Sequence, residues 1–336
     1  MLRANTETHA TCPYTLAASS LRIERDNLKH IRPFFERRLV SDITAAHIAD
    51  YQKSRLTADA SPKTVNLEVG TIRAILRRNR FWSEIQLDVR MLPVTDDVGK
   101  ALTFEEEDAL LEACRQSRSR CLHPAVMIAL NTGMRYGEIR LLQWQQINLK
   151  AKALLVGKSK TASGSGRTIP LNSRLLVILE MWALRFPNRL PTDYVFPSER
   201  YGAGSNDFTP CVYSTDPSKP IHHWKEAWEA AKKRAGKTLR LADGAAAERH
   251  EEVFLPLRCR FHDLRHTACT RLLEAGIPYP IVSAIMGWSA ATAIRMAKRY
   301  GHIGQSAITA AMTALDRPSL EMATRREPNS NEASVV

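Results

Sequence analysis

Apolar side chains recur at three- to four-residue spacings from residue 21 to residue 82, the period of amphipathic helices. A cluster of Ser, Asp and Thr in residues 41–44, typical of a helix N-cap, and a Ser-Pro pair at residues 61–62 divide this stretch into three helical segments. The pattern predicts a small all-helical module over residues 20–92, after an N-terminal extension over residues 1–19.

A second, larger helical region follows a short break. Residues 93–100 mix proline, glycine and acidic side chains without periodicity, which indicates a linker. Helical spacing then resumes, and a second domain is expected over residues 101–317. The helices predicted in it cover residues 102–116, 123–132, 135–147, 173–186, 222–236 and most of 262–315. The final residues, 318–336, lack apolar periodicity and are expected to be disordered.

One segment follows a different pattern. In residues 153–171 two short β-branched runs flank a turn rich in glycine and serine, which predicts a β-hairpin. No other segment has comparable strand character, and residues 187–220 and 238–256 are interpreted as loose connections. The predicted fold class is therefore mainly α, with a helical N-terminal domain and an α-rich second domain that carries a small β-hairpin or sheet.

Composition points toward a polyanionic partner. The 336 residues include 48 Lys and Arg against 35 Asp and Glu, which gives a net charge of +13. Basic side chains outnumber acidic ones both before and after residue 100, so both domains are expected to attract nucleic acid. The six cysteines are scattered without a Cys-x-x-Cys pair, and no run of about 18 apolar residues occurs. These features predict a cytoplasmic protein with reduced thiols, no membrane span and no export signal.

A cluster of ionisable residues lies in the stretch HDLRHTACTRLLEAG, residues 262–276. Asp263 is expected to cap a helix, and His262 and Arg265, three residues apart, to project near its start, where backbone N–H groups add to the guanidinium and favour phosphate. Two alternatives remain open from these residues alone. One is a salt-bridged helix start, and the other is a zinc site built on Cys259, His262, His266 and a distal His250.

Five motifs occur along the chain in a recognisable order. TGMRYGEIRLLQW, residues 132–144, comes first, and the hairpin follows with lysine in its turn. HDLRHT, MGW and RYGH complete the series toward the C-terminus. In this order the sequence resembles the tyrosine recombinases of the phage integrase family, whose core-binding domain would correspond to residues 20–92 and whose catalytic domain to residues 101–317.

The resemblance implies roles for individual residues. Arg135 and Arg265 would form the pair of arginines that binds the scissile phosphate, with Glu138 as a supporting carboxylate. His262 would act as the base, and Trp288 takes a position that histidine holds in most of the family. Lys160 in the hairpin turn would be the general acid, with Lys158 as its rival. Tyr300 would be the nucleophile, although twelve positions separate it from Trp288 where the family commonly has nine.

The chemistry implied is site-specific recombination of double-stranded DNA through a covalent 3′-phosphotyrosine. It needs no metal, nucleotide or other cofactor, because the phosphotyrosine retains the energy of the broken bond. Basic residues expected to contact DNA are Lys63, Arg73, Arg77, Arg78 and Lys158. A dimer on one DNA site and a tetramer in the synapse are implied, and the short N-terminal extension predicts that no arm-binding domain precedes the helical module. The alternatives are a DNA-binding protein that retains the arginine pair without cleaving, and the zinc protein.

Overall fold

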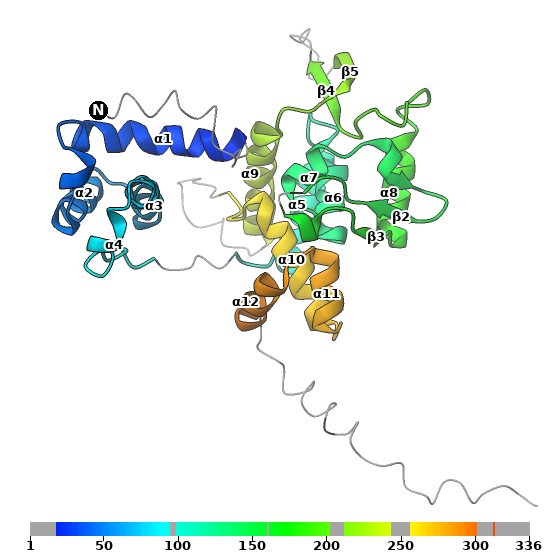
Figure 1. The fold of residues 1–336 in the computed structure, drawn as a ribbon. Helices are drawn as coiled ribbons and strands as arrows, with labels where there is room; N and C mark the ends of the chain where they lie inside the picture. Colours follow the sequence, from blue (N-terminus) through cyan, green and yellow to red (C-terminus); the bar gives the residue numbers. More distant parts are fainter. Residues whose placement is uncertain are drawn as a thin grey trace, which may run out of the picture. The chain divides into compact units, whose positions relative to one another are not determined.

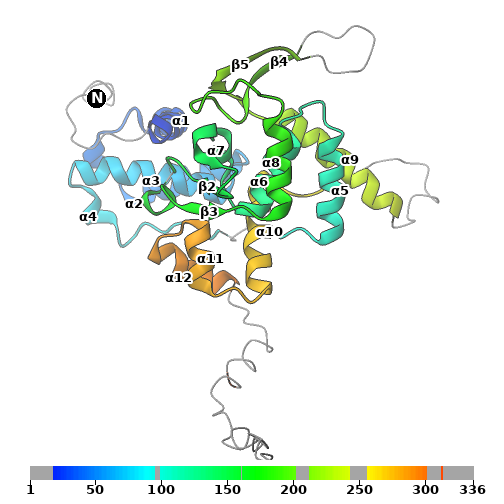
Figure 2. The ribbon, with the colours of Figure 1, turned by 90° about the vertical axis from the view of Figure 1, so that its right-hand side faces the viewer.

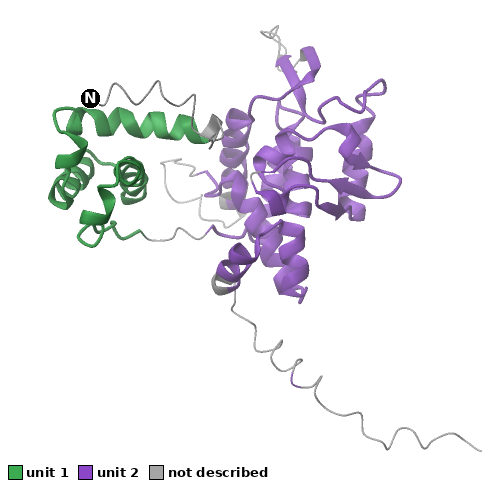
Figure 3. Ribbon diagram, viewed as in Figure 1, with its two compact units in different colours: residues 1–98 green, residues 99–336 purple. Residues whose placement is uncertain are grey.

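The computed structural model describes residues 18–94, 99–159, 161–201, 212–242, 256–300 and 312. It divides the chain into two compact units, residues Met1–Val98 and Gly99–Val336, coloured green and purple in Figure 3. Each unit has a hydrophobic core of its own. Within the described residues no helix has both the length and the apolar character needed to cross a bilayer.

Unit 1 is a bundle of short helices (Figure 1). Its elements are α1 (Ala18–Phe35), the 3-10 helix η3 (Val40–Asp42), α2 (Ala45–Thr57), α3 (Pro62–Arg78) and α4 (Trp82–Ile85). Thr44 caps α2 by accepting from the backbone N–H of His47, and Ser61 caps α3 in the same way. The three helices expected between residues 21 and 82 are therefore confirmed.

The core of unit 1 contains one buried ionic group among its apolar side chains. Glu68, only 1% exposed, accepts 2.8 Å hydrogen bonds from the Tyr51 hydroxyl and from Nε and Nη2 of Arg55. Burial, followed by the hydrogen bond to Glu68, raises the pKa of Tyr51 well above its usual value and keeps its hydroxyl protonated. The carboxylate thus ties α2 to α3 with its oxygens satisfied.

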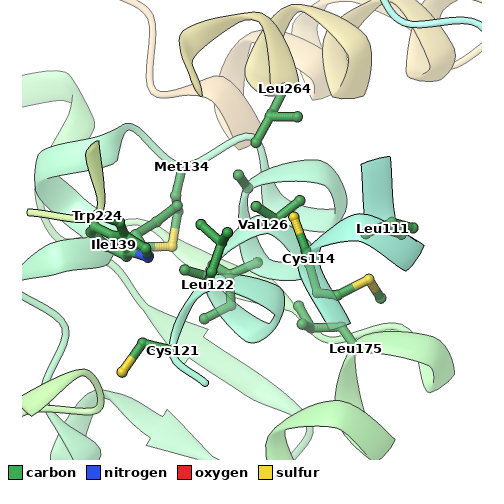
Figure 4. Close-up of a cluster of buried hydrophobic side chains, with 14 of the residues drawn as sticks. Leu111, Cys114, Cys121, Leu122, Val126, Met134, Ile139, Leu175, Trp224 and Leu264 are labelled. Carbon is green, nitrogen blue, oxygen red and sulfur yellow. The ribbon is translucent and has the colours of Figure 1, made fainter. Parts of the chain in front are cut away.

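Unit 2 is built around a buried helix. α6 (Leu122–Thr132) is apolar on every side, as expected of a helix enclosed by others, and α5 (Phe104–Arg115), α8 (Ser173–Ala183) and α10 (Phe261–Glu274) pack on it. Figure 4 shows this core, with Leu122 and Val126 of α6 near side chains of the surrounding elements. The remaining helices are α7 (Tyr136–Arg140), α9 (Lys225–Ala242), α11 (Tyr279–Met286) and α12 (Ala290–Tyr300).

Two small antiparallel sheets accompany these helices. β1 (Ile147–Asn148), β2 (Ala153–Leu155) and β3 (Thr168–Pro170) form the first, in that order, with Leu154 opposite Ile169. β4 (Pro197–Tyr201) and β5 (Val212–Pro220) form the second, which projects from the helices of unit 2 in Figures 1 and 2. The mainly helical fold class and the hairpin at 153–171 are confirmed.

Several local expectations are wrong. Residues 187–220 are not merely a loose connection, because they contain β4 and β5, whose charged and proline-rich sequences lack strand periodicity. Helical structure after Arg135 is limited to α7 and the 3-10 turn η4 (Trp144–Gln146), and α9 continues to Ala242 rather than ending near residue 236. Beyond Tyr300 only Met312 lies within the described residues, so the expected helix near 315 is otherwise outside them.

Candidate active site

Arg135 is positioned by the end of α6. Gly133 ends that helix with a left-handed φ of 62°, a conformation that favours glycine, and its N–H bonds to the carbonyl of Ala129. The chain then turns, and Arg135 becomes the residue that starts α7. Its backbone N–H donates to Glu138 Oε2 at 3.0 Å, and its Nη1 donates to Glu138 Oε1 at 2.8 Å. The side chain of Arg135 remains 23% exposed, which leaves donors free to meet a ligand.

Glu138 is the centre of a buried hydrogen-bond network. Besides Arg135 it accepts from Ser159 Oγ at 2.6 Å and from Arg167 Nη2 at 2.7 Å. Burial alone would raise the pKa of Glu138, but the hydrogen bonds from Arg167, Ser159 and the backbone of Arg135 hold it at about 2. Glu138 is therefore ionised at neutral pH and fixes one edge of the Arg135 guanidinium.

Arg265 lies beneath the same turn. It is 5% exposed, and its Nη1 and Nη2 donate at 2.5 Å to the carbonyls of Gly133 and Met286. Burial, and next the positive charge of Arg135, lower the pKa of Arg265 to about 9, so the guanidinium is still charged at neutral pH. Two cations that repel each other in a partly dry site favour an anion between them.

His262 lies in the first turn of α10, but the cap of that helix differs from the expectation. Arg260, not Asp263, is the N-cap residue, and the Asp263 carboxylate accepts from the Arg260 backbone N–H at 2.8 Å. Asp263 therefore occupies the third helical position, where a carboxylate can reach back to the cap. His262 is exposed, and its ring meets that of His266 edge to face at 5.1 Å. Partial desolvation, and then the charge of Arg265, lower the pKa of His262 and favour the neutral imidazole that a base requires.

Trp288 follows Gly287, a second left-handed glycine, at the end of α11. Its half-buried indole packs in a small cluster with Met286 and Cys269, and its ring centre lies 6.0 Å from that of Tyr279. The Tyr279 hydroxyl donates to the carbonyl of Ala293, which ties α11 to the start of α12. The helix that leads to the candidate nucleophile is thus attached to the rest of the site.

Two candidate residues fall wholly or partly outside the described structure. Tyr300 is the last residue of α12, and its side chain lies outside the described residues. Lys160 lies outside them altogether, in the connection between β2 and β3. Lys158, its rival, is exposed in that connection and precedes Ser159, the residue that donates to Glu138.

Arg167 and Ser159 belong to the site but were not among the residues predicted from the sequence. Both belong to the predicted hairpin, but a buried arginine one residue before a strand has no pattern that separates it from a solvated one. Cys259, His262 and His266, the zinc alternative, do not form a metal-binding group in the part of the chain that the structure describes. His250 lies outside the described residues.

The mainly helical fold of this chain resembles that of solved integrases. The chain aligns with the Tn1549 transposon integrase, solved in complex with circular intermediate DNA, with a TM-score of 0.62 at 18% identity, covering 90% of this chain and 95% of that one. It aligns with lambda integrase, solved as a dimer bound to a COC′ core site, with a TM-score of 0.56 at 18% identity, covering 87% and 92%.

Sequence comparison supplies the family. Residues 100–306 match the phage integrase family, and the chain belongs to that family, as the order of its motifs predicted. It is 26% identical to the integrase of Salmonella phage P22 over 74% of this chain and 56% of that protein. It is also 26% identical to the shufflon-specific DNA recombinase of Escherichia coli, over 85% and 65%. The chain thus spans between about half and two thirds of the length of these relatives.

Proposed function

We propose that this protein is a site-specific DNA recombinase that cuts and rejoins double-stranded DNA through a 3′-phosphotyrosine. The observation that carries the proposal is the hydrogen bond from Arg265, in α10, to the carbonyl of Gly133, two residues before Arg135 at the start of α7. Planar guanidinium groups match the non-bridging oxygens of a phosphate, and their charge offsets the charge that develops during attack. Donors of this kind contribute about 3 to 4 kcal/mol each to other transition states.

The remaining residues take complementary roles. Tyr300 attacks phosphorus, and neutral His262 accepts its proton, because a phenol with a pKa of about 10 is mostly protonated at neutral pH. The 5′ oxygen leaves with a proton from Lys160, or from Lys158 as the alternative. Trp288 contributes its indole N–H or its packing, and Glu138 fixes Arg135.

Unit 1 supplies a basic surface for the duplex. On α3, Lys63, Gly70 and Arg77 are spaced seven residues apart and therefore share one face, and all three are exposed. Gly70 has open space where a side chain would be, which leaves room for a phosphate backbone between the two cations. Arg73 and Arg78 are exposed beside this face, and Lys158 provides a contact from unit 2.

The proposal extends to assembly and location. Lambda integrase was solved as a dimer on a core site, and we expect this chain to act as a dimer on one site and a tetramer in the synapse. Because its substrate is DNA, we place it in the cytoplasm. These expectations are independent of the target sequence.

The test is a covalent adduct. Duplexes that bind the Tyr300→Phe protein are first selected at low salt from DNA of random sequence, and the bound site is mapped by footprinting. The selected duplexes are then synthesised with a nick, so that the cleaved strand cannot be rejoined and the adduct is trapped. The wild-type protein should form a denaturation-resistant adduct, and Tyr300→Phe should form none. Tyr194→Phe, a half-buried tyrosine outside the proposed catalytic residues, is the matched control and should behave as wild type. A wild-type protein that binds these duplexes without forming an adduct would be a DNA-binding protein only.

A further inference from the structure

The connection between β2 and β3 carries the candidate general acid, and one buried side chain joins it to the rest of the site. Arg167 is the residue just before β3, and its side chain is 8% exposed. Its Nη2 donates to Glu138 Oε2 at 2.7 Å, its Nε donates to the carbonyl of Ile285 at 2.9 Å, and its Nη1 donates to the carbonyl of Gly164. One guanidinium therefore links α7, α11 and the lysine-bearing connection.

Ser159 makes the second link between the connection and Arg135. It lies between Lys158 and Lys160, donates through Oγ to Glu138 at 2.6 Å, and accepts from Arg135 Nη1 at 3.2 Å. Its backbone N–H donates to Ser165 Oγ at 2.9 Å. Ser159, the residue after Lys158, is thus bonded to the same carboxylate that orients Arg135.

Two glycines allow close packing around Arg167. A Cβ added at Gly164 would lie 2.6 Å from Ser159 Oγ, and one added at Gly287 would lie 2.8 Å from the Cα of Gly164 and 3.0 Å from Arg167 Nη1. Glycine at 287 lets the connection approach the end of α11 and Arg167, and glycine at 164 leaves room for the Ser159 side chain. The guanidinium donates to a backbone carbonyl on each side, that of Gly164 in the connection and that of Ile285 in α11.

We infer that Arg167 is a positioning residue for cleavage. By bonding to Gly164, Glu138 and Ile285, it holds the β2–β3 connection, whose sequence includes the candidate lysine acid, in a fixed position relative to Arg135. The inference rests on the proposed recombinase function. In the cleavage step the phenol oxygen bonds to phosphorus, the bond to the 5′ oxygen breaks, and that oxygen takes a proton from the lysine. Loss of Arg167 should therefore act mainly on proton delivery to the leaving group.

The experiment compares two leaving groups in single turnovers. The trapping duplex is made with an ordinary 5′ oxygen and with a 5′-bridging sulfur, which leaves as thiolate and needs no proton. Arg167→Gln should cleave the oxygen substrate at least about 10-fold more slowly than wild type, a part of the roughly 100- to 10,000-fold that one general acid contributes. Its deficit on the sulfur substrate should be several-fold smaller.

Arg167→Lys guards against loss of folding. It keeps a charge beside Glu138, but an ammonium lacks the planar fork that reaches all three acceptors, so it should fold and show the same unequal deficit. Ser159→Ala should likewise lose more rate on the oxygen substrate than on the sulfur substrate. The matched control is Arg185→Gln, because Arg185 also pairs with a buried glutamate, Glu199, at 3.3 Å. It should lose stability and slow both substrates equally, if at all.

The outcomes separate the two proposals. Wild-type protein that forms no adduct with either substrate contradicts the recombinase function itself. If wild-type protein cleaves both substrates, two results would overturn the role of Arg167 and leave the recombinase function intact. One is an Arg167→Lys protein that cleaves at the wild-type rate, and the other is an equal loss of rate on the oxygen and sulfur substrates.

Discussion

At the residue scale, Arg265 both belongs to the site and stabilises its surroundings. Its two donors satisfy the carbonyls of Gly133 and Met286, which belong to the turn after α6 and to the end of α11. A lysine in its place cannot present two parallel donors with fixed geometry. The proposed catalysis and the folding of unit 2 therefore depend on the same guanidinium.

Arg265→Lys should consequently reduce both quantities. At least one buried carbonyl would lose its donor, so we expect unit 2 to lose about 1 to 3 kcal/mol of unfolding free energy. Adduct formation should fall by a factor of about 100 or more, from the loss of one fixed donor to the transition state. Urea unfolding and single-turnover cleavage measure the two effects. Arg118→Lys, at an exposed loop position, is the control, and an Arg265→Lys protein with wild-type stability would contradict the structural half of the argument.

Glu138 gives a prediction about acid stability. Its pKa is about 2 in the folded protein and about 4.3 in an unfolded chain, so its contribution is complete above the unfolded value and is lost as the pH falls toward 2. The difference corresponds to about 3 kcal/mol. Glu138→Gln should be less stable at pH 7 and should lose less stability than wild type between pH 5 and pH 3.

Urea unfolding followed by tryptophan fluorescence checks this, because every tryptophan except Trp82 lies in unit 2. Glu180→Gln, at an exposed position on α8, controls for the removal of one carboxylate. If the unfolding free energies of wild type and Glu138→Gln fell in parallel between pH 5 and pH 3, Glu138 would not be the group whose protonation lowers stability.

The residues of the site differ in how far sequence could predict their arrangement. Arg135 follows a helix-ending glycine, and Arg265 belongs to an anion-binding helix start, so each carried a local signal. Arg167 carried none, because its burial depends on Glu138, Gly164 and Ile285, three partners from distant segments. Asp263 was assigned to the cap itself because a carboxylate in either position gives the same local pattern.

At the element scale, helices were predictable where apolar residues recur with helical spacing, and strands were predictable where a turn sequence lies between them. α3 and α6 follow their apolar periods, and β2 and β3 follow the glycine-rich turn. β4 and β5 were missed because their charged and proline-rich sequences lack strand periodicity, and their pairing is accompanied by tertiary contacts such as the hydrogen bond from the N–H of Tyr194 to the carbonyl of Pro217.

The start of unit 2 is locked to α10 by close contact. Gly99 lies so near this helix that an added Cβ would be 2.6 Å from Asp263 Oδ1 and 2.7 Å from His266 Nε2. The N–H of Leu102 donates to Thr267 Oγ1 at 3.0 Å. Because His266 packs against His262, this segment supports the turn that carries the candidate base.

Gly99→Ala should therefore displace the segment or the His266 ring. We expect a loss of about 1 to 3 kcal/mol in the stability of unit 2, the usual cost of overpacking, together with slower cleavage. Gly70→Ala is the control for stability, since its Cβ meets nothing within 4 Å and helix propensity should raise stability by up to about 1 kcal/mol. Equal stability of Gly99→Ala and wild type in thermal unfolding would show that the contact is not maintained in solution.

At the scale of the whole molecule, two units with separate cores share one property, an excess of basic side chains that gives the chain a net charge of +13. Unit 2 holds the arginine pair, and unit 1 offers the α3 face with Lys63 and Arg77. In the proposed reaction, chemistry at one phosphate would thus depend on a much larger surface that neutralises the surrounding DNA backbone.

The salt dependence of DNA affinity measures how many cationic side chains of the α3 face contact phosphates. Each Lys or Arg that neutralises a phosphate adds about 0.9 to the slope of log K against log salt concentration, so Lys63→Gln and Arg77→Gln should each reduce the slope by about that amount and weaken binding across sequences alike. Arg55→Gln is the matched control, because the Arg55 guanidinium already pairs with buried Glu68 and is 16% exposed. It should lower the stability of unit 1 and leave the slope unchanged. Titrations of a labelled duplex at several salt concentrations decide the matter, and unaltered slopes for both α3 variants would remove this face from the DNA interface.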